Sequence, residues 1–368
     1  MRREAARLAL SAACVALVVA SLAVDLPRAA GGEFWGDSAT YYAMAWSLAR
    51  DGDLRYEARD LARIQAEYPG GPSGLFLKRA ASGLTVDTAL GFPWLRRVRP
   101  DEGRLYYAKA FAYPLLAAPL VAVLGSRGLT LVNGLLLALS LLFAVAILRR
   151  RGLPPWPALA SAVSLLLFTV TPLYVVWTTP EVLGLALVAA GLWAWAAERP
   201  LLSAVLFGVA GYLKPPNLLL AAPLGLAPLL PPPGAPFASG LLRGTREALR
   251  RGLVLGATAL AFYGMNAALT GERNYQGGER KTFYGRYPFD ASGTSFDTPG
   301  AGFWMTTNQL GPLVAGRDDS QVSDRSGPAR RRAELVQTLV CNLGYFWVGR
   351  FGGAFANFLP AVAALVLF

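Results

Sequence analysis

The stretch GLTLVNGLLLALSLLFAVAILRRR, residues 128–151, decides the class of fold. Its apolar part, 128–148, is long enough for a helix to cross the hydrocarbon core of a bilayer, which takes about 20 residues. Three consecutive arginines follow, and such clusters stay on the cytoplasmic side of a membrane. The stretch therefore predicts a transmembrane helix that starts outside and ends in the cytoplasm.

The composition of the whole chain is also typical of a membrane protein. Hydrophobic residues make up 54% of the 368 residues and charged residues 16%, less charge than a soluble domain carries. The net charge is +12, but many arginines lie between apolar segments, where they set orientation, so we expect no nucleic-acid partner. The chain has no histidine, which excludes histidine-based acid–base catalysis, histidine metal sites and Ser-His-Asp triads.

Apolar segments on both sides of this stretch extend the pattern. The start, MRREAARLALSAACVALVVASLAV, predicts a retained helix with its N-terminus in the cytoplasm, and a cleaved signal peptide is the alternative. Residues 110–125 are apolar but short and broken by prolines, which favours a re-entrant or interfacial helix over a crossing. Two short apolar arms, 201–213 and 217–230, flank Lys214 and predict a shortened hairpin with this lysine near its outer tip.

These segments predict an all-α, polytopic membrane protein: a helical bundle with two long outside loops. The apolar end, FANFLPAVAALVLF, has no polar flank after it and predicts a piece of a longer protein. The expected order is a first transmembrane helix at 1–24, a first outside loop with interfacial helices at 25–127, a transmembrane bundle at 128–269, a second outside loop at 270–340 and an incomplete last transmembrane segment at 341–368.

The first outside loop begins with an unusual stretch, EFWGDSATYYAMAWSLARDGDL, residues 33–54. Asp37 or Ser38 can cap the start of a helix, and Gly52 can end it. We expect an interfacial helix with its aromatics at headgroup depth. The helix dipole favours an anion at the position of Asp37, although an ordinary helix cap is an equal alternative. Helical spacing puts the aromatics on two faces, one with Tyr41 and the other with Tyr42 and Trp46.

Further charges are predicted on the same outer side. Glu181, in WTTPEVLG, suits the first turn of a helix at the membrane edge. Lys214 is a lone cation between apolar arms, which either extends to the interface or pairs with a phosphate. Arg350 stands among aromatics and glycines before the last apolar segment, where it needs an anion nearby. The loop at 274–289, NYQGGERKTFYGRYPF, contains Arg280 and Lys281 and predicts a lid or a solvated loop.

Several of these segments together carry a family resemblance. GDSATYYAMAWSLARDGDL, residues 36–54, resembles the first outside loop of GT-C fold glycosyltransferases, the membrane enzymes that use polyprenyl-phosphate sugars. It is similar to their protein mannosyltransferase and aminoarabinose transferase branch. AYPLLAAPLVAVLG, TPLYVVWTTPEVLGLAL and GVAGYLKPPNLLL stand in the order that this family shows. The mannosyltransferases carry two adjacent acids at the position of GDS, whereas this chain has a single acid there, Asp37.

The resemblance implies a bacterial cell-envelope transferase in the cytoplasmic membrane, with its active site on the periplasmic side. Such an enzyme moves a sugar, with inversion, from a polyprenyl-phosphate donor to a hydroxyl of a lipid or glycan acceptor. Asp37 would be the catalytic base. Glu181 would assist it, bind the sugar, or bind a divalent ion such as Mg²⁺ or Mn²⁺; no dedicated metal site and no other cofactor is expected. The donor phosphate would be bound by Lys214, Arg350, Arg280 and Lys281, and the sugar or lipid by Tyr41, Tyr42 and Trp46.

Two other classes of function are left open by the sequence. A transporter or lipid flippase predicts charged residues at mid-membrane within paired broken helices. A non-catalytic, truncated membrane scaffold predicts that Asp37→Asn changes no glycan or lipid product. The charges of this chain gather at one side of the predicted spans, which favours an enzyme at the membrane surface.

Overall fold

The structure is a computed structural model, and it describes most of the chain up to residue 284. The chain divides into two compact units, Met1–Trp304 and Met305–Phe368. The described part of the second unit is limited to short pieces, among them β8 (Thr307–Asn308) and β9 (Gly311–Pro312). The described residues are 2–79, 83–87, 94–98, 104–230, 237–276, 280–284, 307–308, 311–312, 336–337, 339–341 and 343–344.

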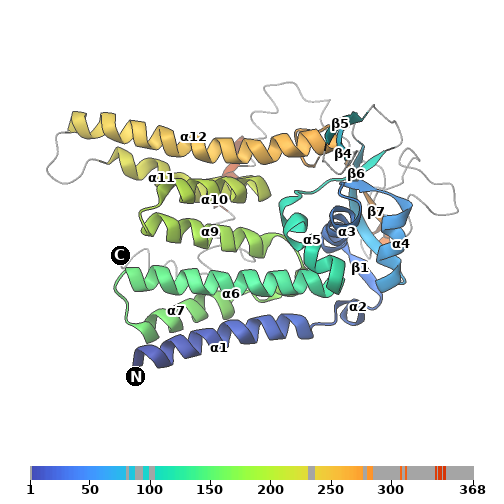
Figure 1. The fold of residues 1–368 in the computed structure, drawn as a ribbon, viewed down its shortest axis with the longest axis horizontal. Helices are drawn as coiled ribbons and strands as arrows, with labels where there is room; N and C mark the ends of the chain where they lie inside the picture. Colours follow the sequence, from blue (N-terminus) through green and yellow to red (C-terminus); the bar gives the residue numbers. More distant parts are fainter. Residues whose placement is uncertain are drawn as a thin grey trace. The chain divides into compact units, whose positions relative to one another are not determined.

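The first unit is built mainly from helices that lie side by side (Figure 1). α6 packs against α1 and α9, and α10 packs against α9 and α12. Three of the described helices, α1, α6 and α12, are long and apolar enough to cross a membrane. The prediction of a mainly helical chain is therefore confirmed for the described residues, and these three helices could cross a membrane by length and composition. The bounds are α1 (Arg2–Ala23), α6 (Ser126–Arg150), α7 (Pro155–Leu167), α8 (Leu173–Trp177), α9 (Glu181–Ala196), α10 (Pro200–Leu213) and α12 (Phe237–Thr270).

The segment after α10 turns back along that helix. It consists of η2 (Pro215–Ala221), α11 (Ala222–Leu226) and η3 (Ala227–Leu229), and α11 and η3 reach α12. A Cβ atom on Gly211 would lie 2.4 Å from Leu218 Cδ2, so the glycine in α10 permits this close return. Lys214 stands at the turn between the two arms, as the hairpin prediction expects.

Arginines gather at one end of these helices. Arg149 and Arg150 close α6, and Arg199 precedes α10. Figure 1 shows the N-terminus, the end of α6 and the α9–α10 connection at the same end, whereas the β-strands lie at the other. The strand end therefore corresponds to the predicted outside loops.

A five-stranded sheet occupies the predicted first outside loop, so the expectation of an all-α fold is wrong there. β1 runs parallel to β3, and β6 and β7 pair with β3 in antiparallel fashion. The pairing of β3 with β7 joins the two predicted outside loops in one sheet. The strands are β1 (Glu33–Trp35), β2 (Arg55–Tyr56), β3 (Gly71–Arg79), β6 (Leu105–Tyr107) and β7 (Arg280–Tyr284), with a separate hairpin of β4 (Gly83–Asp87) and β5 (Trp94–Val98).

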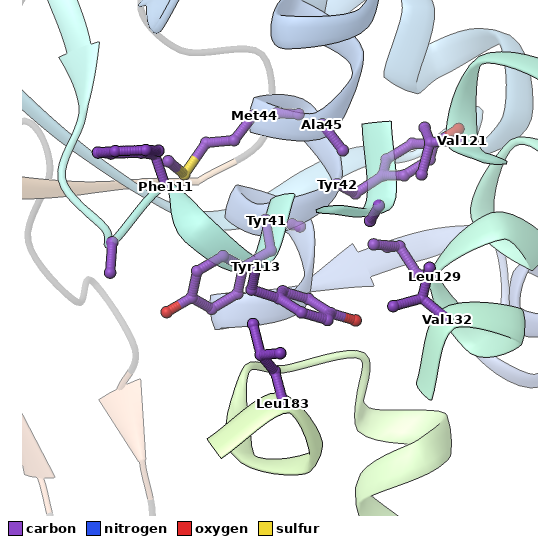
Figure 2. Packing of buried hydrophobic residues seen from close by; sticks show 14 of the residues in the cluster. Tyr41, Tyr42, Met44, Ala45, Phe111, Tyr113, Val121, Leu129, Val132 and Leu183 are labelled. Atoms are coloured by element: carbon purple, nitrogen blue, oxygen red, sulfur yellow. The ribbon is translucent and has the colours of Figure 1, made fainter. Parts of the chain in front are cut away.

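Helix α3 (Gly36–Arg50) lies in the core of this region, and its place at a membrane interface stays a prediction. It packs against α5 (Ala112–Leu124) and β3, with α4 (Ala58–Glu67) and the short α2 (Leu26–Ala29) nearby in the chain. Tyr41 and Tyr42 are both buried. Figure 2 shows Tyr41 and Tyr113 of α5 beside Leu183 of α9, so the same core reaches the start of a bundle helix. At 13 residues, α5 is shorter than the roughly 20 needed for a full crossing.

Candidate functional site

Asp37 lies in the first turn of α3, with its carboxylate bound to a lysine. The preceding residue, Gly36, has a φ of +59°, a conformation that glycine adopts without steric cost. Asp37 Oδ1 is 2.7 Å from Lys109 Nζ. The Asp37 side chain is 42% exposed. The predicted carboxylate is therefore accessible to a substrate, held by a cation and placed where the helix dipole favours it.

Lys109 is a site residue that the sequence analysis missed. It follows β6 and precedes α5, and its side chain is only 13% exposed. Its ammonium lies 4.0 Å from the centre of the Phe76 ring. Burial lowers the pKa of Lys109 below its ordinary value, against the opposing effect of Asp37, and the charges of Arg280 and Lys214 lower it further. The argument applied to Lys214, a lone cation in an apolar stretch, fits YYAKAFAY equally well and could have found it.

Glu181 and Lys214 form a second ion pair. Glu181 is the first residue of α9, after Pro180, and Lys214 follows the last residue of α10. Lys214 Nζ donates to Glu181 Oε1. The lysine was expected to extend to the interface or to bind phosphate, and in this structure its partner is a carboxylate.

The two ion pairs are assigned to one site because the start of α3 bonds to the end of α8, shortly before α9 begins. Ser38, next to Asp37, donates from its hydroxyl to the Trp177 carbonyl, just before the turn that leads into α9. Tyr41 lies near both acids: burial raises its pKa well above the usual value, and Asp37 and then Glu181 add to this. Its ring meets that of Tyr113 edge-on, with centroids 5.6 Å apart.

Strand β7 brings one further cation to the site. Arg280 lies over the Phe76 ring, with its guanidinium carbon 5.4 Å from the ring centre, so it shares this ring with Lys109. Lys281, the next residue, pairs with Leu77. Successive residues of a strand point to opposite faces, so Lys281 faces away from Phe76. Of the two cations predicted in this loop, Arg280 therefore shares the Phe76 ring with Lys109, and phosphate binding by Lys281 stays a prediction.

Tyr42 lies apart from the two ion pairs, and its binding of sugar or lipid stays a prediction that these contacts do not support. Its side chain is 1% exposed, and its hydroxyl donates to the carboxylate of Glu67. Glu67 also accepts from the backbone amide of Ser126, at 3.1 Å, and so caps the start of α6. Trp46 lies on the same side of α3 as Tyr42, with ring centroids 6.4 Å apart. This face of the helix serves packing and helix capping.

The sequence also predicts a further phosphate ligand and leaves open a bound metal ion. Arg350, a predicted phosphate ligand, lies outside the described residues. Within the described ranges, no group of three or more His, Cys, Asp or Glu side chains could hold a metal ion. One oxygen of each carboxylate contacts a lysine ammonium, and binding of a divalent cation by Glu181 stays a prediction.

Compared with protein-family models, curated proteins and solved structures, the chain matches none. The chemistry of the site must therefore be argued from its own groups. Among the described residues, three cations, Lys109, Lys214 and Arg280, lie near two carboxylates, so this group of side chains carries a surplus positive charge. Such a cluster can bind an anion and at the same time present a carboxylate to a neutral hydroxyl.

Proposed function

We propose that the protein is a membrane glycosyltransferase that moves a sugar, with inversion, from a polyprenyl-phosphate donor to an acceptor hydroxyl. The observation that carries the proposal is the partly exposed carboxylate of Asp37 held by Lys109, with Lys214 and Arg280 close to the same lysine. An acid beside clustered cations suits a reaction that removes a proton at one point and releases a phosphate at another.

The proposed reaction assigns a separate task to each group. The acceptor oxygen forms a bond to the anomeric carbon and loses its proton to Asp37. The bond between that carbon and the phosphate oxygen breaks, and its electron pair leaves with the polyprenyl phosphate. Lys214 and Arg280 stabilise the charge of the leaving phosphate, and Lys109 holds the Asp37 carboxylate in position. Glu181 lies near Tyr41, as Asp37 does, and is assigned to binding the sugar.

The proposal places the site on the outer side of the cytoplasmic membrane. Support comes from the arginines at the opposite end of the helices, because such clusters remain in the cytoplasm. A polyprenyl donor would present its sugar at the boundary between lipid and water, where α3 and the start of α9 meet. In cells that carry Asp25→Cys in a cysteine-free background, a membrane-impermeant thiol reagent applied from outside is expected to label the protein. Labelling only after the membrane is opened would refute this orientation.

Glycolipid profiling of cells that express wild type, Asp37→Asn or Asp25→Asn tests the function. Asp37→Asn is expected to accumulate a sugar-carrying polyprenyl phosphate and to lose the transferred product. Asp25→Asn is a matched control because Asp25 is an exposed carboxylate whose oxygen caps α2, a task that asparagine also performs. Unchanged profiles in the Asp37 variant would favour the scaffold, whereas an altered distribution of a lipid between leaflets, without loss of product, would favour a flippase.

A further inference from the structure

A basic cavity lies between α1, α6 and α7, at the end of the helices opposite the sheet. Its volume is about 310 Å³, and three arginines line it: Arg3 and Arg7 from α1, and Arg149 from α6. None of the lining residues in the described part of the chain is acidic. The remaining lining residues are apolar: Ala6, Leu10, Leu142, Val145, Ala146, Pro155 and Leu159.

An apolar groove continues from this cavity along the same two helices. The groove has a volume of about 440 Å³ and lies between α1 and α6. Leu142 lines both hollows, and Cys14 of the groove stands one helical turn from Leu10 of the cavity. From Arg7 to Val19, the far lining residue on α1, the rise of a helix corresponds to about 18 Å. The combined hollow is therefore basic at one end and apolar for about the length of an acyl chain.

Small residues bring α1 and α6 together directly beyond the groove. A Cβ atom on Gly134 would lie 2.3 Å from Ser21 Oγ, so only glycine permits this approach. Closer to the N-terminus, α1 carries side chains that no helix of the described chain covers, among them Val15 and Val19. A groove that is open on its side and closed at its far end suits an elongated apolar ligand.

We propose that this hollow binds an anionic glycerophospholipid of the cytoplasmic leaflet, with its phosphate on the arginines and one acyl chain in the groove. Guanidinium groups bind phosphate through paired hydrogen bonds, and basic pockets between transmembrane helices on the cytoplasmic side suit lipid headgroups. The inference goes beyond the proposed transferase function. It concerns the end of the helices opposite Asp37, and it requires only that the arginine end faces the cytoplasm.

The first test is retention of lipid by the purified full chain in detergent, measured by native mass spectrometry with phosphatidylglycerol and phosphatidylcholine. We expect one tightly retained phosphatidylglycerol, bound about tenfold or more better than phosphatidylcholine. Arg7→Gln with Arg149→Gln is expected to abolish this preference. Arg150→Gln with Arg151→Gln removes the same charge at the same end without touching the cavity, and is expected to keep it.

The second test separates a lipid from a free anion. Val15→Trp fills the groove, keeps all three arginines and replaces a side chain that is exposed, so the fold is expected to tolerate it. It is expected to weaken retention of phosphatidylglycerol about tenfold. Equal retention of the two lipids by wild type, or equal losses in both arginine pairs, would overturn the proposal. So would displacement of the lipid by millimolar inorganic phosphate, which would identify the site as a free-anion site.

Discussion

Replacing Lys78 by methionine tests how the sheet is joined to the bundle. Lys78 lies in β3 and is fully buried, and its ammonium donates to Thr270 Oγ1 at 3.0 Å and to the Asn274 carbonyl at 3.3 Å. Thr270 ends α12, so this side chain links residues that are 192 positions apart in the chain. Burial lowers the pKa of Lys78 from 10.5 to about 8, although Glu272 opposes the change.

This pKa determines how stability depends on pH. Because the pKa in the folded protein lies below that of the unfolded chain, the unfolded chain binds more protons between about pH 8 and pH 10.5. The free energy of unfolding therefore rises with pH across this window. The charged, buried lysine lowers the free energy of unfolding by about 3 kcal/mol at neutral pH. About 2 kcal/mol of this free energy is regained between about pH 7 and pH 9.5.

Lys78→Met removes the buried charge and leaves few polar groups without a hydrogen-bond partner. The Thr270 hydroxyl keeps its bond to the Asn266 carbonyl, so only the Asn274 carbonyl loses its hydrogen bond, at a cost of about 1 kcal/mol. We expect the variant to be about 2 kcal/mol more stable than wild type near pH 7 and nearly equal to it near pH 9.5. Urea unfolding in detergent, followed by tryptophan fluorescence, measures this difference in stability. Both proteins carry the same buried tyrosines, so the contribution of these groups cancels in the difference. A variant that is less stable than wild type at both pH values would refute the reasoning.

The remaining predictions concern the site and its packing. Lys109→Met is expected to lower the rate of sugar transfer about tenfold or more, because the Asp37 carboxylate loses its partner. Lys281→Met, the control, is expected to leave the rate within about twofold. Equal losses of rate in a radiolabelled-donor assay would contradict this prediction. Tyr42→Phe removes a bond to the half-buried carboxylate of Glu67 and is expected to cost about 2 kcal/mol of stability without changing the transfer rate. A lower rate with unchanged stability would return Tyr42 to the site. Gly128→Val is expected to lower the thermal midpoint, because its Cβ would lie 2.5 Å from the α5 backbone, whereas Gly256→Val, with open space around it, should leave the midpoint unchanged.

Hydropathy and arginine spacing could predict the helices because these signals are local. The segment at 128–148 lies within α6, and the lone Lys214 stands between its two arms. The sheet could not be predicted in this way. Its strands β1, β2 and β6 have only two or three residues, and β7 comes from a loop about 200 positions after β3. Such pairing depends on contacts that no local period reveals.

The candidate site could likewise be predicted only where the signal is local in the sequence. Helical spacing correctly separated Tyr41 from Tyr42, because that spacing depends only on the period of the helix. It could not tell which face of α3 would meet α9 and which would meet Tyr68 and Phe34. The ion pairs of Asp37 with Lys109 and of Glu181 with Lys214 join residues 72 and 33 positions apart. Acids and cations can be found as candidates in a sequence, but their pairing is a property of the fold.

The Glu67 carboxylate joins the first residue of α6 to Tyr42 of α3, and Asp37 stands in the first turn of that same helix. A transmembrane helix adjusts its tilt to the thickness of the surrounding bilayer. A change in the tilt of α6 would therefore be transmitted through this carboxylate to the helix that carries the proposed base. We expect the rate of sugar transfer to depend on acyl-chain length when the protein is reconstituted in lipids of different thickness, and we expect Glu67→Gln to weaken that dependence.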